Sequence, residues 1–186
     1  MATVSVIIPC YNQGQFVDEA VISVLDQGVE DLEIIIINDG STDPYTNDIL
    51  SDYKRENVTV IVTDNNGLAA ARNTGIEVAT GKYILPLDAD DKIGQGYVEK
   101  AVSLLEKNPD LGIVYCQASL FGAVETDWDL PVYSLEAMLI DNVIFCSAFF
   151  RREDWLEVGG YDVGMIYGWE DYSFWLSLIE RDREVF

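Results

Sequence analysis

The sequence contains no histidine, and its 186 residues include only 11 basic side chains against 33 acidic ones. Without histidine the chain cannot form a Ser-His-Asp triad or a metal site with an imidazole ligand. The formal net charge of −22 makes nucleic acids and anionic lipid surfaces unfavourable partners, because their phosphates would be repelled. An anionic substrate would have to be held locally by a divalent cation, a helix N-terminus or a well-placed arginine.

Cysteine and long apolar segments are also scarce. Cys10, Cys116 and Cys146 are far apart, match no metal-ligand spacing, and are odd in number, which argues against a disulfide framework. Each lies in an apolar run, which predicts buried free thiols. No apolar run reaches the roughly 18 to 20 residues that a membrane-spanning helix needs, and the chain opens into an apolar segment without a signal sequence. A cytoplasmic domain is expected, with truncation from a longer protein left open.

What the sequence does have is apolar character sufficient for one sizeable core, at 49% hydrophobic residues. Short β-branched runs alternate with stretches of helical periodicity, which predicts parallel strands joined by right-handed crossovers. The near-continuous apolar run over 32–37 is typical of a strand covered on both faces. We therefore predict one α/β domain over 1–186, with a mostly parallel, Rossmann-like sheet flanked by helices on both faces. The expected strands are 4–8, 32–37, 58–62, 83–87 and 112–116, and the expected helices are about 16–25, 44–55, 68–79 and 96–107.

The pattern is less regular after residue 116. A loop or short strand is expected over 119–132, a helix over 134–140 and a strand over 143–150. A short helix is expected over 153–158, and a final helix over about 171–181. The sequence shows no internal repeat, low-complexity segment or interdomain linker.

Polar clusters follow three of the predicted strands. Ligands of open α/β sheets bind outside the carboxyl ends of the strands, so side chains that are distant in sequence should converge on one crevice. The clusters are Pro9-Cys10-Tyr11-Asn12, Asn38-Asp39-Gly40-Ser41 and Asp88-Ala89-Asp90-Asp91.

Common nucleotide and calcium motifs are absent. A dinucleotide-binding domain needs Gly-x-Gly-x-x-Gly directly after a strand, whereas residues 11–15 are Tyr-Asn-Gln-Gly-Gln. No Gly-x-x-x-x-Gly-Lys-Ser/Thr occurs, which excludes a Walker-type phosphate loop. An EF-hand starting at Asp88 would need an oxygen ligand and a glycine where the chain has Lys92 and Ile93.

The spacing of Asp88 and Asp90 at a strand end suits a different chemistry. Two carboxylates one residue apart on a tight turn can face the same crevice, one toward a ribose hydroxyl and one toward a hard cation. A magnesium or manganese ion there could offset the charge of a departing diphosphate. On its own, Asp-x-Asp is a weak signal that more often marks solvated acids capping the next helix, and Asp91 is expected to be such an acid.

Taken together, the motifs of this chain resemble the ordered motif set of family 2 glycosyltransferases, over about residues 3–180. The residues that carry the resemblance are 4–12 (VSVIIPCYN), 36–43 (IINDGSTD), 67–75 (GLAAARNTG), 87–91 (LDADD), 149–152 (FFRR), 159–162 (GGYD) and 168–171 (GWED). The resemblance implies a GT-A-type fold with a nucleotide-sugar-binding part over about 1–116 and an acceptor part over about 117–186. It also implies an inverting transfer of a sugar from a nucleoside diphosphate, usually UDP, to a hydroxyl of a glycan, lipid or protein, in cell-wall or polysaccharide biosynthesis.

Site roles follow from the same resemblance. Pro9 and Tyr11 would line the nucleobase pocket, and Asp39 would accept a hydrogen bond from the base. Arg72 would bind diphosphate or orient a carboxylate. Asp88 would contact ribose or metal, and Asp90 would be the main ligand of Mn²⁺ or Mg²⁺. The general base would be Asp171, with Glu170 beside it.

Two departures from the family pattern leave alternatives open. Position 38 is Asn where the family commonly has a second Asp, and no histidine follows the Glu-Asp motif as a further metal ligand. A non-catalytic sugar-nucleotide-binding domain and a nucleotidyltransferase therefore remain competing interpretations, although residues 11–15 lack the basic phosphate loop of the latter. Of the tryptophans, Trp169 is the one expected to stand near a sugar, and most of the others are expected in the core. Nucleic acid is not an expected partner, and peripheral membrane contact would require regions outside this chain.

Overall fold

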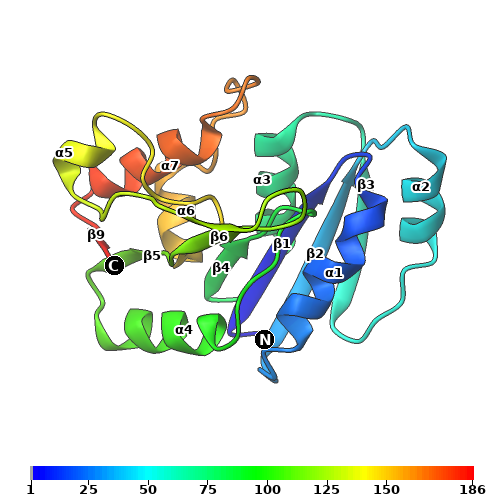
Figure 1. Ribbon diagram of the computed structural model, residues 1–186, viewed down its shortest axis with the longest axis horizontal. Helices are drawn as coiled ribbons and strands as arrows, with labels where there is room; N and C mark the ends of the chain where they lie inside the picture. The colour runs from blue at the N-terminus through cyan, green and yellow to red at the C-terminus, as the bar shows by residue number, and fades with distance from the viewer. Residues whose placement is uncertain (1) are drawn as a thin grey trace.

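The chain is built around a central sheet whose strands are β1 (Val4–Cys10), β2 (Leu32–Asp39), β3 (Val58–Thr63), β4 (Tyr83–Pro86), β5 (Leu111–Val114), β8 (Phe149–Arg151) and β9 (Glu184–Val185). The computed structural model describes residues 2–186 (Figure 1), and within them the strand order is β3-β2-β1-β4-β8-β5-β9. β1 is parallel to β2 and β4, and β2 is parallel to β3. β8 is antiparallel to β4 and β5. The predicted mostly parallel sheet is confirmed.

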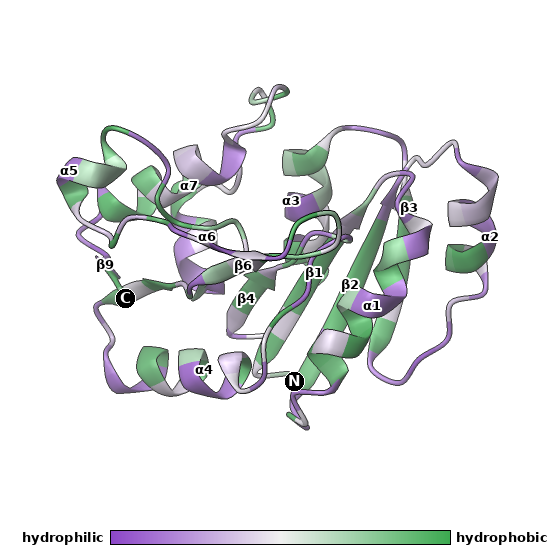
Figure 2. Cartoon of the chain, in the orientation of Figure 1, coloured by the Kyte–Doolittle hydropathy of each residue, from purple (hydrophilic) through white to green (hydrophobic). Residues whose placement is uncertain are grey.

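Helices cover both faces of this sheet, as predicted. They are α1 (Gly14–Leu25), α2 (Pro44–Ser51), α3 (Leu68–Val78), α4 (Tyr97–Lys107), α5 (Leu135–Met138), α6 (Arg152–Val158) and α7 (Glu170–Ile179). Val6 and Ile8 of β1 belong to the core formed with α1 and α4, whereas Ile7 belongs to the core formed with α3, α6 and α7. This two-sided burial explains why β1 and β2 are hydrophobic along most of their length (Figure 2).

The approach of α3 to the sheet depends on Gly75. A Cβ atom at this position would lie 2.5 Å from Cγ2 of Ile7, closer than packed carbon atoms come to one another. The glycine therefore lets α3 rest directly on β1, which brings Arg72, one turn earlier on the helix, under the carboxyl ends of the strands.

The helix predicted over 44–55 ends early, at Ser51. It starts as expected, because the Asp43 carboxylate accepts a hydrogen bond from the N–H of Thr46 at 2.8 Å. After Ser51, however, the Tyr53 hydroxyl donates to the Asp18 carboxylate at 2.7 Å, and Arg55 binds the same carboxylate through both of its oxygens. These contacts hold the segment against α1 and away from the axis of α2.

The second half of the chain departs most from the sequence-based expectation. The strand predicted over 143–150 is limited to β8, because Val143, Ile144 and Ala148 are buried without joining the sheet. Their apolar character reflects burial in the core, and burial does not require an extended strand. A two-stranded antiparallel hairpin, β6 (Ala118–Leu120) and β7 (Thr126–Trp128), lies in the segment predicted as a loop or short strand. β9 was not predicted.

The cysteines are free, as expected, but only in part buried. Cys10 is buried, Cys146 is half-buried and Cys116 is exposed, so the prediction of burial is wrong for Cys116. Its exposure follows from its place just beyond β5, where the chain leaves the sheet toward the hairpin. Between residues 2 and 186, no helix is both long and apolar enough to cross a bilayer.

Candidate active site

The loops that follow β1 and β2 are joined by Asn12. Its backbone has φ of +56°, a left-handed conformation that asparagine tolerates better than most residues. Its side-chain oxygen accepts hydrogen bonds from the N–H groups of Thr42 at 2.7 Å and Asp43 at 2.8 Å, and its own N–H donates to the Ser41 hydroxyl at 3.0 Å. Two of the predicted strand-end clusters therefore form one rigid unit.

A cavity of about 430 Å³ opens at these strand ends. Its lining includes five residues predicted for nucleotide or metal binding, namely Pro9, Tyr11, Asp39, Asp88 and Asp90. Gly67, Leu68 and Ala71 at the N-terminus of α3 complete one wall. The topology thus brings together residues that the sequence separates by up to 81 positions, from 9 to 90.

Asp39 is buried and holds the loop that leads into α3. Its carboxylate accepts hydrogen bonds from the N–H groups of Asn66 and Gly67, both at 3.0 Å. The neighbouring Asn38 donates through its side-chain NH₂ to Asn47 at 2.9 Å and accepts from the N–H of Ser41 at 3.1 Å. An aspartate at position 38 could not make the first of these bonds, which gives the Asn at this position a physical reason.

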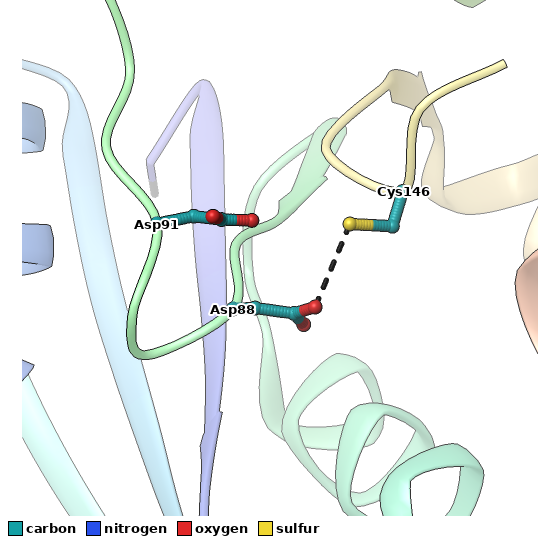
Figure 3. A group of neighbouring side chains, drawn as sticks. All are labelled: Asp88, Asp91 and Cys146. Carbon is teal, nitrogen blue, oxygen red and sulfur yellow. Dashed lines mark hydrogen bonds between the residues drawn. The ribbon is translucent and has the colours of Figure 1, made fainter. Parts of the chain in front are cut away.

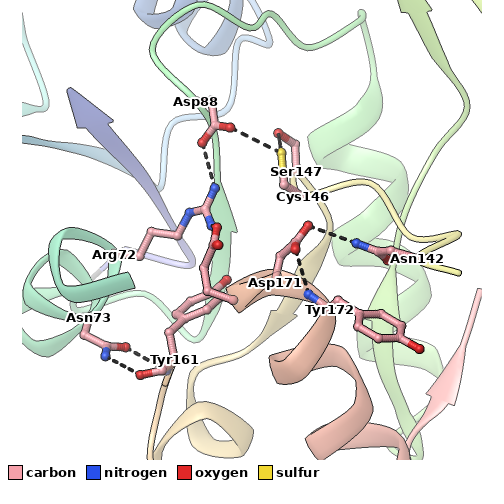
Figure 4. Close-up of polar contacts among 10 residues, drawn as sticks. Arg72, Asn73, Asp88, Asn142, Cys146, Ser147, Tyr161, Asp171 and Tyr172 are labelled. Atoms are coloured by element: carbon pink, nitrogen blue, oxygen red, sulfur yellow. Dashed lines mark hydrogen bonds and ion pairs between the residues drawn. The ribbon is translucent and has the colours of Figure 1, made fainter. Parts of the chain in front are cut away.

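Arg72 does not line this cavity. It is 1% exposed, and its guanidinium donates to Glu170 at 2.5 Å and to Asp88 at 2.8 Å. Tyr161 lies against it, with the ring centroid 5.6 Å from Cζ. Of the two roles implied for Arg72, the geometry favours orienting carboxylates, since both terminal nitrogens are already engaged with protein groups (Figure 4).

A second cavity, of about 320 Å³, adjoins the first. The two share Leu68 and Asp88 in their linings. The second cavity is further lined by Arg72, Trp128, Asn142, Cys146, Trp169, Glu170 and Asp171, among others. Asn142, Cys146 and Trp128 were not among the predicted site residues, and they come from the irregular segment where periodicity carried no signal.

The two adjacent acids at the start of α7 have different surroundings. Asp171 accepts hydrogen bonds from the Asn142 side chain at 3.1 Å and from the N–H of Tyr172 at 2.7 Å (Figure 4). Burial raises the pKa of Asp171, and the neighbouring Glu170 raises it further, against the opposing effects of Tyr172, Arg72 and Asn142. Glu170 is buried in its ion pair with Arg72. Asp171 is therefore the acid of the pair that is better placed to exchange a proton with a ligand.

The loop after β4 gathers further carboxylates. Asp88, Asp91 and Cys146 each offer a ligand atom, and within the described chain these atoms lie within 4.8 Å of one another (Figure 3). Burial raises the pKa of Asp91 to about 6, with Asp88 and Asp90 adding to the effect. Asp91 was predicted to be a solvated helix cap, and this is wrong: it is half-buried, and α4 begins only at Tyr97.

The acids of this loop suit a hard divalent cation. Mg²⁺ and Mn²⁺ prefer oxygen ligands, which Asp88 and Asp91 supply, and the like charges of the loop would be relieved by a cation. Burial and the nearby Asp88 raise the pKa of the Cys146 thiol, and its Sγ donates to Asp88 at 3.6 Å. Two of the three ligand atoms are carboxylate oxygens, so the set is better suited to a hard cation than to a soft metal. Asp90 is exposed and faces the first cavity.

Comparison with known proteins is consistent with this site. The model of the family described as Glycosyl transferase family 2 matches residues 5–157. TuaG of Bacillus subtilis, a glycosyltransferase assigned to teichuronic acid biosynthesis, is 33% identical over 96% of this chain and 72% of its own length. The uncharacterized glycosyltransferase YibD of Escherichia coli is 42% identical over 83% of this chain and 43% of its own length. Glu170 and Asp171 lie beyond the family-model match.

Solved structures share the fold. TarS of S. aureus in complex with UDP has a TM-score of 0.75 at 20% identity, and the mannosyltransferase PcManGT of Pyrobaculum calidifontis in complex with GDP-Man and Mn²⁺ has the same values. The alignments cover 94% and 98% of this chain but only 54% and 53% of those chains. This chain thus spans about half the length of these structures. The extent of the family match and the TuaG relationship show that the chain belongs to glycosyl transferase family 2, with a GT-A fold.

Proposed function

We propose that this chain is the catalytic domain of an inverting, metal-dependent glycosyltransferase that moves a sugar from a UDP-sugar to a hydroxyl acceptor. The observation that carries the proposal is the junction of two cavities at Asp88. One holds the predicted nucleotide residues, and the other holds the predicted base. A donor that spans the junction would present its anomeric carbon to an acceptor in the second cavity.

In this proposal the nucleoside occupies the first cavity. Tyr11 lines this cavity and is partly exposed, so its ring is available to pack on the base, while Asp39 fixes the loop that leads into α3. The N-terminus of α3 opens on the same cavity, and helix N-termini favour anions such as diphosphate. The proposed division into a nucleotide part over about 1–116 and an acceptor part over about 117–186 is supported by most of the lining residues, although Leu68, Arg72 and Asp88 of the first part also line the second cavity.

A divalent cation would be held by Asp88 and Asp90, which both line the first cavity, and Asp91 offers a ligand atom within 4.8 Å of one from Asp88. When bound, it supplies positive charge that offsets the diphosphate leaving group. Arg72 orients Asp88 for this role through their 2.8 Å ion pair. Because Arg72 also binds Glu170, this one buried side chain positions both Asp88 and the start of α7.

Transfer would proceed by in-line displacement. Asp171 takes the proton of the acceptor hydroxyl as its oxygen bonds to the anomeric carbon, and the bond from that carbon to the diphosphate oxygen breaks with its electron pair on the diphosphate. Attack from the face opposite the leaving group inverts the configuration. Asn142 keeps the Asp171 carboxylate turned toward the cavity through their 3.1 Å hydrogen bond.

Calorimetry with UDP, GDP and ADP in the presence of Mn²⁺ tests the donor assignment. TarS was solved with UDP and PcManGT with GDP-Man, so the two neighbours support different bases. We expect UDP to bind most tightly, and equal affinities or none would reject the nucleobase assignment. UDP release from UDP-sugars in the presence of acceptors then tests turnover. Binding without transfer to any acceptor would indicate a non-catalytic nucleotide-sugar-binding domain.

A further inference from the structure

Two tryptophans at the second cavity leave much of their indole surface in solvent. Trp169 is 57% exposed and Trp128 at the end of β7 is 43% exposed, whereas Trp155 and Trp175 are buried in the core. Exposed aromatic surface is unfavourable in water, and a ligand that covers it recovers that free energy. Both rings have fixed neighbours: Trp128 packs edge-on against Phe145 with centroids 5.5 Å apart, and Trp169 against Tyr172 with centroids 5.6 Å apart.

The backbone at Trp169 adds a second indication. Its φ is +69°, directly after Gly168 at +97°, and this left-handed conformation is disfavoured for a bulky side chain. Glycine would be unstrained there. A strained and exposed tryptophan contributes little to the core, which points to a use of its side chain in binding.

The charges of this cavity restrict what can bind. Among the described residues that line it, Arg72 is the one cationic side chain, and both of its terminal nitrogens are paired with Asp88 and Glu170. Asp171 adds a further carboxylate. A carboxylate or phosphate on an acceptor that reaches Asp171 would lie beside this like charge with no unpaired cationic side chain in the lining, and such like-charge contacts discriminate strongly between ligands.

We infer that the second cavity is an acceptor subsite for a neutral pyranose, whose C–H faces pack on Trp128 and Trp169 while one hydroxyl reaches Asp171. This inference rests on the proposed function and narrows its acceptor to an uncharged sugar. Phosphorylated sugars and uronic acids are excluded as preferred acceptors at this position.

The first test compares acceptors. Glycosides of neutral hexoses and N-acetylhexosamines are each paired with the uronic acid or 6-phosphate of the same configuration, and transfer from the UDP-sugar is measured. The neutral member of an accepted pair should have a kcat/KM at least about tenfold higher. Leu130→Lys, which adds a cation to the cavity lining, should narrow that difference by improving the anionic acceptor.

The second test uses the tryptophans. Trp169→Gly and Trp128→Ala should each raise the acceptor KM by about threefold to tenfold, with a much smaller change in the affinity for the UDP-sugar. Trp169→Phe should keep part of the acceptor affinity. Tyr167→Ala is the matched control, because Tyr167 is 94% exposed and lies outside the cavity lining, in the loop that projects before α7 (Figure 1).

Each contrary result has a defined meaning. Equal or better use of anionic acceptors, or transfer to no glycoside while donor hydrolysis is intact, would overturn the inference. So would loss of UDP-sugar affinity in both tryptophan variants, because the rings would then hold the donor. Absence of any nucleotide binding or hydrolysis in the unaltered protein would instead reject the proposed function itself.

Discussion

At the scale of single residues, the sequence neighbours Glu170 and Asp171 have different surroundings. Glu170 is fixed by Arg72 in the protein interior, while Asp171 faces the second cavity with a raised pKa. A carboxylate that is engaged in a buried ion pair cannot readily accept a substrate proton, because protonation would break the pair. This comparison supports the proposed general-base role of Asp171.

Asp171→Asn should therefore reduce sugar transfer by at least about a hundredfold, since a general base typically contributes 10² to 10⁴ in rate. Asn is nearly isosteric and keeps an oxygen that can accept from the N–H of Tyr172. UDP affinity and thermal stability should change little. Steady-state transfer, calorimetry and thermal melting measure the three quantities, and a variant with near-normal turnover would show that the proton goes elsewhere.

The raised pKa of Asp171 also predicts a pH dependence. Because burial favours the protonated acid, the base form appears only above the usual aspartate range near pH 4. The acid limb of kcat should lie at correspondingly higher pH and be absent from the residual activity of Asp171→Asn. A kcat profile with its midpoint at or below the usual aspartate range would contradict this.

The raised pKa of Asp171 also affects the free energy of unfolding, which should fall with rising pH, whereas kcat should rise. A carboxyl whose folded-state pKa is raised contributes stability that is fully present below its unfolded-state pKa and is lost as pH rises through the folded-state pKa. Asp171→Asn removes this contribution. Urea unfolding of the unaltered protein and of Asp171→Asn, measured from the unfolded-state pKa to above the folded-state pKa of Asp171, should show a smaller loss of stability in the variant.

At the scale of elements, Arg72 connects three parts of the fold. It lies on α3, its partner Asp88 follows β4, and its partner Glu170 begins α7. Removing one partner of a buried ion pair leaves the others as uncompensated buried charges. The arrangement thus links the loop after β4 to the start of α7.

Arg72→Met should lower the free energy of unfolding by about 3–5 kcal/mol, measured by urea denaturation. Adding Glu170→Gln should recover part of that stability, since it removes the stranded charge, but not transfer activity. Arg55→Met provides the control: its ion pair with Asp18 is largely exposed, and such pairs contribute about 0–1 kcal/mol. Equal losses in the two single variants would show that the buried pairs do not connect these elements.

The helices and strands differ in how well the sequence predicts them. The first four strands and the helices between them were predictable, because two-sided burial produces apolar runs and right-handed crossovers place helices between successive parallel strands. That topology was enough to bring Pro9, Asp39 and Asp88 to one cavity. The strand predicted over 143–150 was too long compared with β8, because a buried irregular segment is as apolar as a strand.

The second cavity was harder to foresee. Asn142 and Trp128 reach it from the segment between β5 and β8, where the chain has little periodicity and its course depends on tertiary packing. The burial of Arg72 was equally hidden, because helical position alone does not reveal which partners neutralise a charge. Half-burial of Asp91 followed from the fold of its loop and not from its spacing.

At the scale of the whole molecule, the net charge of −22 works against the proposed donor. A diphosphate approaching the first cavity meets Asp39, Asp88 and Asp90, while Arg72, the nearest buried cation, is already paired. Long-range repulsion of this kind is screened by salt over about 8–10 Å at physiological ionic strength. A cation bound among the carboxylates would act directly at the site of contact.

These two effects can be separated, which gives the last prediction. Mn²⁺ or Mg²⁺ should tighten UDP binding by at least about tenfold, or about 1.4 kcal/mol, whereas NaCl at equal ionic strength should give a much smaller gain. Asp90→Ala should remove most of the gain from the divalent cation without unfolding the domain, because its exposed side chain contributes little to the core. Asp52→Ala is the matched control, since it removes one exposed charge far from the cavity lining. Calorimetry in chelator, in NaCl and in Mn²⁺ measures all of these affinities.

If chelator leaves UDP affinity unchanged, the cation has no part in binding. If NaCl matches Mn²⁺, screening of the charge of the whole molecule explains the effect without a specific site.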